Sequence, residues 1–132
     1  INFINTSIMC FTETRLSNKH IQSGSYDIEG FTLFGNTIDI TPIHGMCIYI
    51  KDDISIQNIH HFNSKDIEIS ILYLQGMQIL FIYKAPNFSL TNFISKLKHH
   101  VMDLLDLSLP ILIMGDFNVD IKNNKNKTST NL

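Results

Sequence analysis

Residues 110–120 have the sequence PILIMGDFNVD, and this stretch decides the fold. Its first half is a short apolar run rich in branched residues, which predicts a buried strand. Gly115 then ends the apolar run, and Asp116 and Asn118 follow on either side of an aromatic residue. An acid at the end of a buried strand is held rigidly and close to solvent, as catalytic carboxylates commonly are. A structural alternative exists: Gly115 permits a turn, Asp116 accepts from turn amides and Asn118 takes a left-handed backbone.

Other short apolar runs predict further strands before this stretch. They are Ser7–Phe11, Phe31–Phe34, Gly45–Lys51, a weaker run over Ile54–Ile59, Asp66–Leu74 and Met77–Tyr83. The run from Asp66 alternates cleanly, with Ile67, Ile69 and Ile71 on one face and Glu68, Ser70 and Leu72 on the other. Gln75-Gly76 is a turn pattern, so the last two runs predict a hairpin, and Gly35-Asn36 predicts an earlier turn.

The period becomes helical only once, over Leu90–Leu107, with Ser89 or Thr91 as the N-cap. Its apolar stripe consists of Phe93, Leu97, Val101, Leu104 and Leu105. Many strands and few helices predict an α+β fold, a two-layer β-sandwich flanked by helices, instead of a doubly wound parallel sheet. We expect one domain over residues 1–121 and a polar loop or disordered tail over residues 122–132.

Composition narrows the function only slightly. The net charge of −2 and the pI near 6.3 supply no basic field, so contact with nucleic acid would depend on local lysines and bound cations. Cys10 and Cys47 lie inside apolar runs and are expected to be buried thiols, as in a reducing intracellular setting. No run approaches the ~20 apolar residues of a membrane span, and no signal peptide is visible, so we expect no membrane partner.

Two acids end apolar strands, and together they suggest a site. Glu13 follows the run over Ser7–Phe11, and Asp116 follows the run over residues 110–114. If the two strands are close in the sheet, the acids converge at one rim, where Tyr83 also ends a strand. Two carboxylates and an amide suit a hard divalent cation with an activated water. Either acid alone is more often structural, and the histidine pairs His60-His61 and His99-His100 are expected at surface or partly buried positions.

Four segments, in this order and spacing, resemble the endonuclease/exonuclease/phosphatase family. They are IMCFTETRL (8–16), GMCIYIK (45–51), IYKAPN (82–87) and IMGDFNVD (113–120). The Thr-Glu-Thr and Gly-Asp-Phe-Asn segments are most similar to the AP-endonuclease-like domains of non-LTR retrotransposons. The resemblance extends from about Ser7 to Ile121 and implies a DNase I-like sandwich.

The resemblance also implies roles for particular residues. Glu13 would hold a catalytic Mg²⁺, or Mn²⁺, and Tyr83 would contact the scissile phosphate. Asp116 would orient or deprotonate the attacking water, and Asn118 would donate to the phosphoryl oxygen. The implied function is Mg²⁺-dependent nicking of DNA by a retroelement-type protein, in the nucleus if genomic DNA is the substrate. A phosphatase or RNA nuclease of the same family, or a non-catalytic relic or binding module, remains the alternative.

Two parts of the family's pattern are missing from this sequence. The family begins with a strand that carries a metal-binding Asn, but Asn2 and Asn5 lie too close to the next strand. The family ends with a segment containing Asp and His, and no His follows His100 here. We therefore expect a domain truncated at both ends, part of a longer polypeptide, with little or no activity by itself.

Overall fold

The computed structural model describes residues 5–36 and 45–120. In chain order the elements are β1 (Ile8–Phe11), α1 (Asn18–Gln22), β2 (Phe31–Asn36), β3 (Met46–Lys51), β4 (Ile56–Asn63), β5 (Ile67–Leu74), β6 (Met77–Lys84), α2 (Leu90–Val101), the 3₁₀ helix η1 (Met102–Leu104) and β7 (Ile111–Asp116). The tail predicted over residues 122–132, and with it the domain boundary at residue 121, lies outside the described residues.

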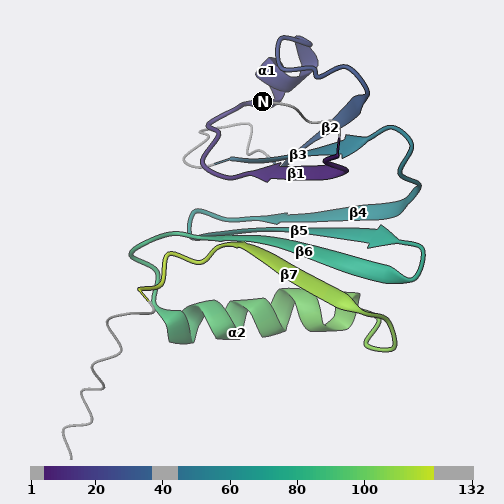
Figure 1. Ribbon diagram of the computed structural model, residues 1–132. Coiled ribbons are helices and arrows are strands. Elements are labelled where there is room, and N and C mark those ends of the chain that lie inside the picture. The colour runs from purple at the N-terminus through teal and green to yellow at the C-terminus, as the bar shows by residue number, and fades with distance from the viewer. Residues whose placement is uncertain (1–4, 37–44, 121–132) are drawn as a thin grey trace, which may run out of the picture.

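The strands form two sheets that face each other (Figure 1). The first sheet has the order β1-β3-β2 and is antiparallel. The second has the order β4-β5-β6-β7, in which β6 and β7 are parallel and the other pairs antiparallel. Helix α1 lies outside the first sheet and α2 covers the outer face of the second. The predicted α+β sandwich flanked by helices is therefore confirmed.

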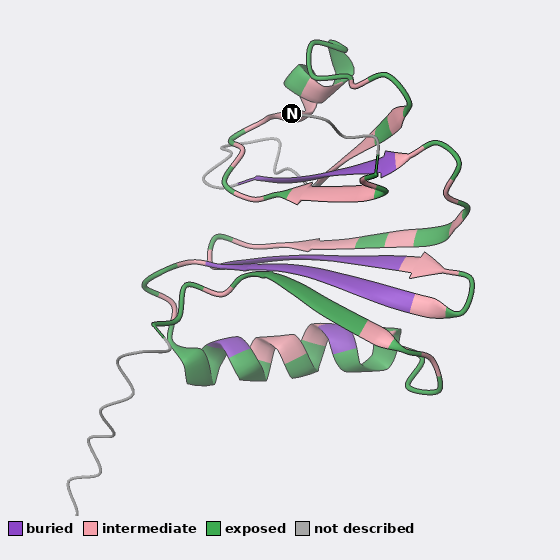
Figure 2. Ribbon diagram, in the orientation of Figure 1, coloured by how far each residue is buried: buried purple, intermediate pink, exposed green. Residues whose placement is uncertain are grey.

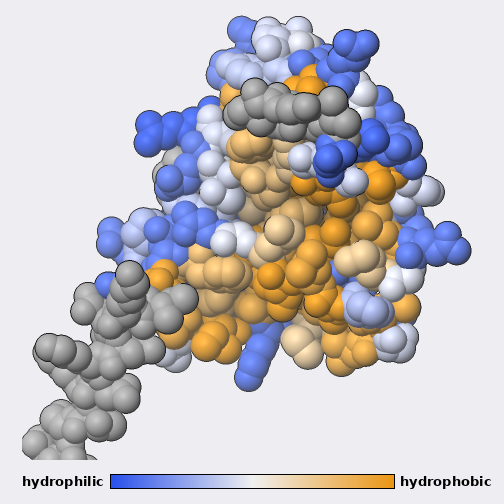
Figure 3. Space-filling model, viewed as in Figure 1, coloured by the Kyte–Doolittle hydropathy of each residue, from blue (hydrophilic) through white to orange (hydrophobic). Residues whose placement is uncertain are grey.

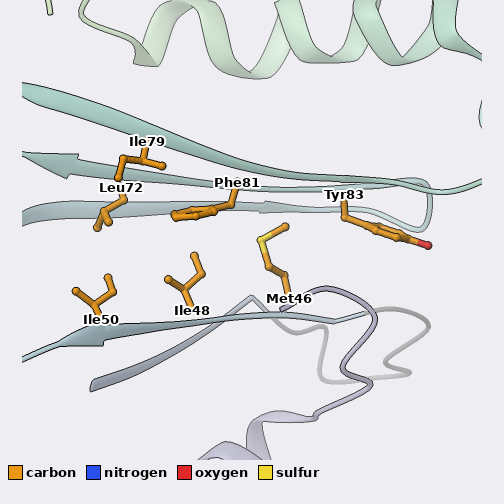
Figure 4. Close-up of a cluster of buried hydrophobic side chains, with 7 residues drawn as sticks. All are labelled: Met46, Ile48, Ile50, Leu72, Ile79, Phe81 and Tyr83. Carbon is orange, nitrogen blue, oxygen red and sulfur yellow. The ribbon is translucent and has the colours of Figure 1, made fainter. Parts of the chain in front are cut away.

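The alternation in β5 places its side chains in two separate cores. Ile67, Ile69 and Ile71 face α2 and pack in an outer core that includes Phe93 and Val101. The opposite face of the second sheet meets the first sheet in an inner core, shown in Figure 4. The inner core consists of Met46, Ile48, Ile50, Leu72, Ile79, Phe81 and Tyr83. Strands β3, β5 and β6 are consequently the most buried parts of the chain (Figure 2).

Several elements differ from the predictions, including β4, which extends to Asn63, beyond the weak run predicted over Ile54–Ile59. Helix α1 was not predicted, because its five residues are polar and none is buried; it depends on Ser17, whose side chain accepts from the backbone N–H of His20. Helix α2 begins after Ser89 as expected but ends at Val101, where a 3₁₀ turn follows. Strand β2 continues through the Gly35-Asn36 segment predicted as a turn, because this segment pairs with β3.

The prediction that the strand in residues 110–114 is buried is wrong. In β7, Leu112 is 45% exposed, Ile113 53% and Met114 44%. Among the described strands β7 pairs only with β6, so it forms the edge of the second sheet. Leu112 and Met114 line a cavity instead of packing against the first sheet. The face seen in Figure 3 accordingly displays a broad apolar area.

Both cysteines are free thiols, as expected; Cys47 is buried, but Cys10 is only partly buried, contrary to the expectation that both are buried. Burial raises the pKa of Cys47 from its ordinary value of 9.0 to about 11. Burial, helped by the negative charges of Cys47 and Glu68, raises the pKa of Cys10 to about 12. No helix in the described ranges is both long and apolar enough to cross a membrane.

These thiols predict a loss of stability in alkali. The folded chain keeps both thiol protons above pH 9, whereas the unfolded chain releases them, so the free energy of unfolding should fall as pH rises from 9 toward 12. Denaturant unfolding in a reducing buffer at pH 8, 9 and 10 measures this slope, to which tyrosines of the unfolded chain also contribute as the pH approaches their ordinary pKa of 10.0. The Cys10→Ala/Cys47→Ala variant should lose less stability over the same interval. An equal slope in both proteins would rule out the thiols as the cause.

Candidate active site

A hydrogen bond across the sandwich forms the centre of the candidate site. The hydroxyl of Tyr83, near the end of β6, donates to Oε1 of Glu13 at 2.7 Å. Tyr83 is fully buried, and Figure 4 shows its hydroxyl at the end of the inner core, beyond Met46. Glu13 is exposed and follows β1 with a left-handed backbone (φ 55°). A phenol carried by the second sheet therefore fixes a carboxylate carried by the first.

Asp116 joins this cluster from the neighbouring strand. It ends β7 and lies opposite Tyr83 in the parallel β6–β7 register. The expectation that Glu13 and Asp116 meet within one sheet is wrong, because β1 and β7 belong to different sheets. The two acids are brought to the same end of the sandwich by facing sheets, with Tyr83 between their strands.

Asn118 is held in place by two hydrogen bonds. Its backbone N–H donates to Oδ1 of Asp116 at 3.0 Å, and its Nδ2 donates to the carbonyl of Lys84 at 2.8 Å. Its φ of 45° is left-handed. The structural reading is thus confirmed for Asp116 and Asn118, whereas Gly115 lies within β7 and not in a turn. An Asn amide carries two N–H groups, so one remains to donate to a ligand while the other contacts Lys84.

Tyr83 is protonated at neutral pH and acts as a hydrogen-bond donor. Burial raises the pKa of its hydroxyl above the ordinary value of 10.0, and the hydrogen bond to Glu13 raises this pKa further. The negative charges of Glu13, Asp116 and Glu68 act in the same direction. The neutral phenol can therefore donate a hydrogen bond to a carboxylate or a phosphate oxygen without losing its proton.

The donor set fits a hydrated hard cation better than a closed metal cage. In the part of the chain that the structure describes, no group of three or more His, Cys, Asp and Glu side chains could hold a metal ion. Mg²⁺ usually takes one or two carboxylates and completes its shell with waters and substrate phosphate oxygens. Glu13 and Asp116 are exposed, and neither forms an ion pair with another described residue. Their oxygens suit Mg²⁺ or Mn²⁺.

The histidine pairs lie in other contacts. The ring of His100 stacks on Phe62 with centroids 3.8 Å apart, and Nδ1 of His61 lies 2.8 Å from Oγ of Ser70. His60 and His99 are exposed. The expectation of surface or partly buried positions is confirmed.

A cavity of about 510 Å³ opens beside Asp116, between β1 and the β6–β7 pair. Most of its lining is apolar and includes Ile8, Cys10, Phe81 and Met114. The polar side chains of the lining are limited to Ser7, Thr12 and Asp116, so the cavity offers few hydrogen-bond donors to a phosphate anion. The polar rim formed by Glu13, Tyr83, Asp116 and Asn118 is therefore the better candidate for chemistry.

Two buried charged residues near the site were not singled out from the sequence. Lys84 is 2% exposed, and its Nζ donates to the carbonyls of Ala85 and Phe88 at 2.9 Å each, which holds the turn that binds Asn118. Glu68 is also 2% exposed. The sequence did contain a sign of Glu68, since an acid interrupts the apolar pattern of β5.

One comparison with known proteins finds a match. Residues 2–127 match the sequence pattern described as the Endonuclease/Exonuclease/phosphatase family, which spans nearly the whole chain. None of the curated proteins matches the chain.

Proposed function

The chain belongs to the endonuclease/exonuclease/phosphatase family, and we propose that it carries the site for metal-dependent hydrolysis of a DNA phosphodiester, which produces a nick. Members of this family are hydrolases, either nucleases or phosphatases. The observation that carries the proposal is the convergence of Glu13, Tyr83 and Asp116 at one end of the sandwich. These residues come from three separate strand ends.

Each residue has a role that its position supports. Glu13 would hold Mg²⁺, with Mn²⁺ as the substitute, and a cation there would supply neutralisation of the phosphate charge. Tyr83, which remains protonated, has a single O–H: it donates to Glu13 in this structure and would turn to the scissile phosphate when substrate binds. Asp116, exposed at the end of β7, orients or deprotonates the attacking water. Asn118 uses its second amide N–H to stabilise charge that develops on the phosphoryl oxygen.

We further propose that the parent protein is a retroelement-type nuclease that acts on DNA. The Thr12–Arg15 segment and the Gly115–Asn118 segment support this narrower assignment, because these two motifs resemble those of non-LTR retrotransposon endonucleases. A longer polypeptide and a nuclear location follow from the same proposal when genomic DNA is the substrate.

Plasmid nicking by the full-length gene product that contains this chain tests the proposal. We expect supercoiled DNA to become nicked circles with Mg²⁺ and to stay intact with EDTA. Residues 1–132 alone should show little or no activity. An RNA hairpin and p-nitrophenyl phosphate serve as comparison substrates. Faster cleavage of either would favour the RNA nuclease or the phosphatase, and DNA binding without cleavage would favour a binding module.

A further inference from the structure

Glu68 is a buried acid in a position where an apolar residue is the default. It lies on the inner face of β5, and its cross-strand neighbour on β6 is Tyr83. Its side chain is 2% exposed, beside an inner core of Ile, Leu, Phe and Met side chains. Burying a carboxylate is costly unless hydrogen bonds compensate for the lost water. Its contacts should therefore reveal what it does.

Glu68 connects the two sheets. Its Oε1 accepts a hydrogen bond from the backbone N–H of Gly45, which immediately precedes β3, at 2.9 Å. The carbonyl of Gly45 in turn accepts from the backbone N–H of Thr14 at 2.9 Å. A Cβ at position 45 would lie 2.8 Å from Oγ1 of Thr14 and 3.1 Å from the backbone N of Arg15. Only glycine permits this close approach. Glu68 therefore contacts the Thr14 turn through a residue that no other amino acid could replace without displacing the turn.

The turn that Gly45 contacts has an unfavourable backbone. Glu13 and Arg15, on either side of Thr14, both have left-handed conformations, with φ of 55° and 54°. Such conformations persist in ordinary residues only where surrounding contacts impose them. The Thr14–Gly45 hydrogen bond is a contact of this kind, and it aims the Glu13 side chain at Tyr83.

We propose that Glu68 is a positioning residue, which fixes the Glu13 carboxylate for the divalent cation by holding Gly45 and, through it, the Thr14 turn. This inference rests on the proposed function, because it assumes that Glu13 binds the cation. Tyr83 links Glu13 to Glu68 by a second route, because its hydroxyl donates to Glu13 and it is the cross-strand neighbour of Glu68. Partners that orient metal ligands commonly change metal affinity by 10- to 100-fold when they are removed.

Two variants and one control separate positioning from plain stability. Glu68→Gln keeps a side-chain oxygen for the Gly45 N–H, whereas Glu68→Leu removes it. Gln78→Leu is the control: Gln78 is 1% exposed at the opposite end of β6, and its Oε1 accepts from the backbone N–H of Asp106 at 3.0 Å. If Glu68→Leu does not fold, Glu68→Asp, which withdraws the carboxylate by one methylene, takes its place.

Two readouts apply to the chain itself. Amide hydrogen exchange should show at least a tenfold loss of protection at Gly45 and Thr14 in Glu68→Leu, but not in Glu68→Gln or Gln78→Leu. Paramagnetic broadening of the Glu13 amide by Mn²⁺ should give an apparent Kd that is ~10- to 100-fold weaker in Glu68→Leu only.

The outcomes distinguish this inference from the proposed function. Unchanged protection of Gly45 and Thr14 in Glu68→Leu would overturn the positioning role. Lost protection with unchanged Mn²⁺ affinity, or equal weakening by Gln78→Leu, would also overturn it, because Glu68 would then be merely structural. If the unsubstituted chain does not bind Mn²⁺ at Glu13, the proposed metal site fails, and the exchange data still decide whether Glu68 holds the turn.

Discussion

Replacing Asp116 by Asn should lower the rate of Mg²⁺-dependent DNA nicking by ~10²–10⁴-fold, the usual contribution of a group that positions or accepts a reacting proton. Asn keeps the Oδ1 that accepts from the Asn118 N–H, so the turn survives the change. The side chain is exposed, and the free energy of unfolding should therefore change by less than ~0.5 kcal/mol. The measurement is the nicking rate of the full-length gene product at saturating Mg²⁺, together with a thermal melt.

A suitable control is Asp103→Asn. Asp103 is an exposed acid in η1. Its neighbour Leu104 has the backbone carbonyl that accepts from the hydroxyl of Tyr73, at the end of the second sheet away from the candidate site. Its replacement should leave the nicking rate unchanged. Full activity in Asp116→Asn would remove Asp116 from the reaction and leave it only the structural role in the turn.

Replacing Gly115 by Ala should separate β7 from β6. Gly115 has a φ of +151°, which L side chains rarely adopt, and a Cβ there would lie 1.8 Å from the carbonyl oxygen of Ile82. That oxygen belongs to the backbone of a fully buried residue, so it cannot move aside cheaply. We expect a loss of about 3 kcal/mol or more in the free energy of unfolding, a large share of the stability of an ordinary domain. Denaturant unfolding of the chain measures it.

Gly76→Ala provides the matched comparison for this prediction. Gly76 also has a positive φ, of +82°, but nothing lies within 4 Å of a Cβ at that position. Its replacement should cost only the ~1–2 kcal/mol of a left-handed alanine. If Gly115→Ala is no more destabilising than Gly76→Ala, β7 does not depend on close backbone contact with β6.

Local pattern was sufficient to predict the interior strands. The alternation over Ile67–Leu74 predicted a strand with two different faces, and the structure buries both of them, including the polar Glu68 and Ser70. The Gln75-Gly76 turn and the strand that follows it are confirmed for the same reason, since a hairpin depends on neighbouring residues alone. Ser89 begins α2 through a hydrogen bond to the Asn92 N–H, which is also a local contact.

The hydropathy pattern did not predict burial where a strand's position in the sheet decides how far it is buried. Residues 111–114 are as apolar as a central strand, yet β7 lies at an edge, and hydropathy carries no information about which strands are neighbours. The arrangement of the candidate site was mispredicted for the same reason. The ends of β1 and β7 were correctly identified as places where acids leave the apolar runs, but their meeting across two sheets depends on topology.

Glu68 shows a third kind of failure. Alternation placed Glu68 on the face of β5 opposite the isoleucines, but its partner Gly45 is 23 residues away along the chain, directly before β3 of the other sheet. Nothing in the local sequence specifies that contact. Helix α1 was missed for a related reason, since five polar residues stabilised by a capping Ser17 leave no apolar stripe.

The dependence of nicking on Mg²⁺ concentration, measured for the full-length gene product and its Glu13→Gln variant, tests the central claim most directly. Glu29→Gln, an exposed acid in the segment between α1 and β2, is the control. The proposed site predicts that Glu13→Gln requires at least ~10-fold more Mg²⁺ for the same rate, while Glu29→Gln behaves as the unsubstituted protein. Nicking by Glu13→Gln at unchanged rate and unchanged Mg²⁺ dependence would contradict the assignment of Glu13 as the metal ligand.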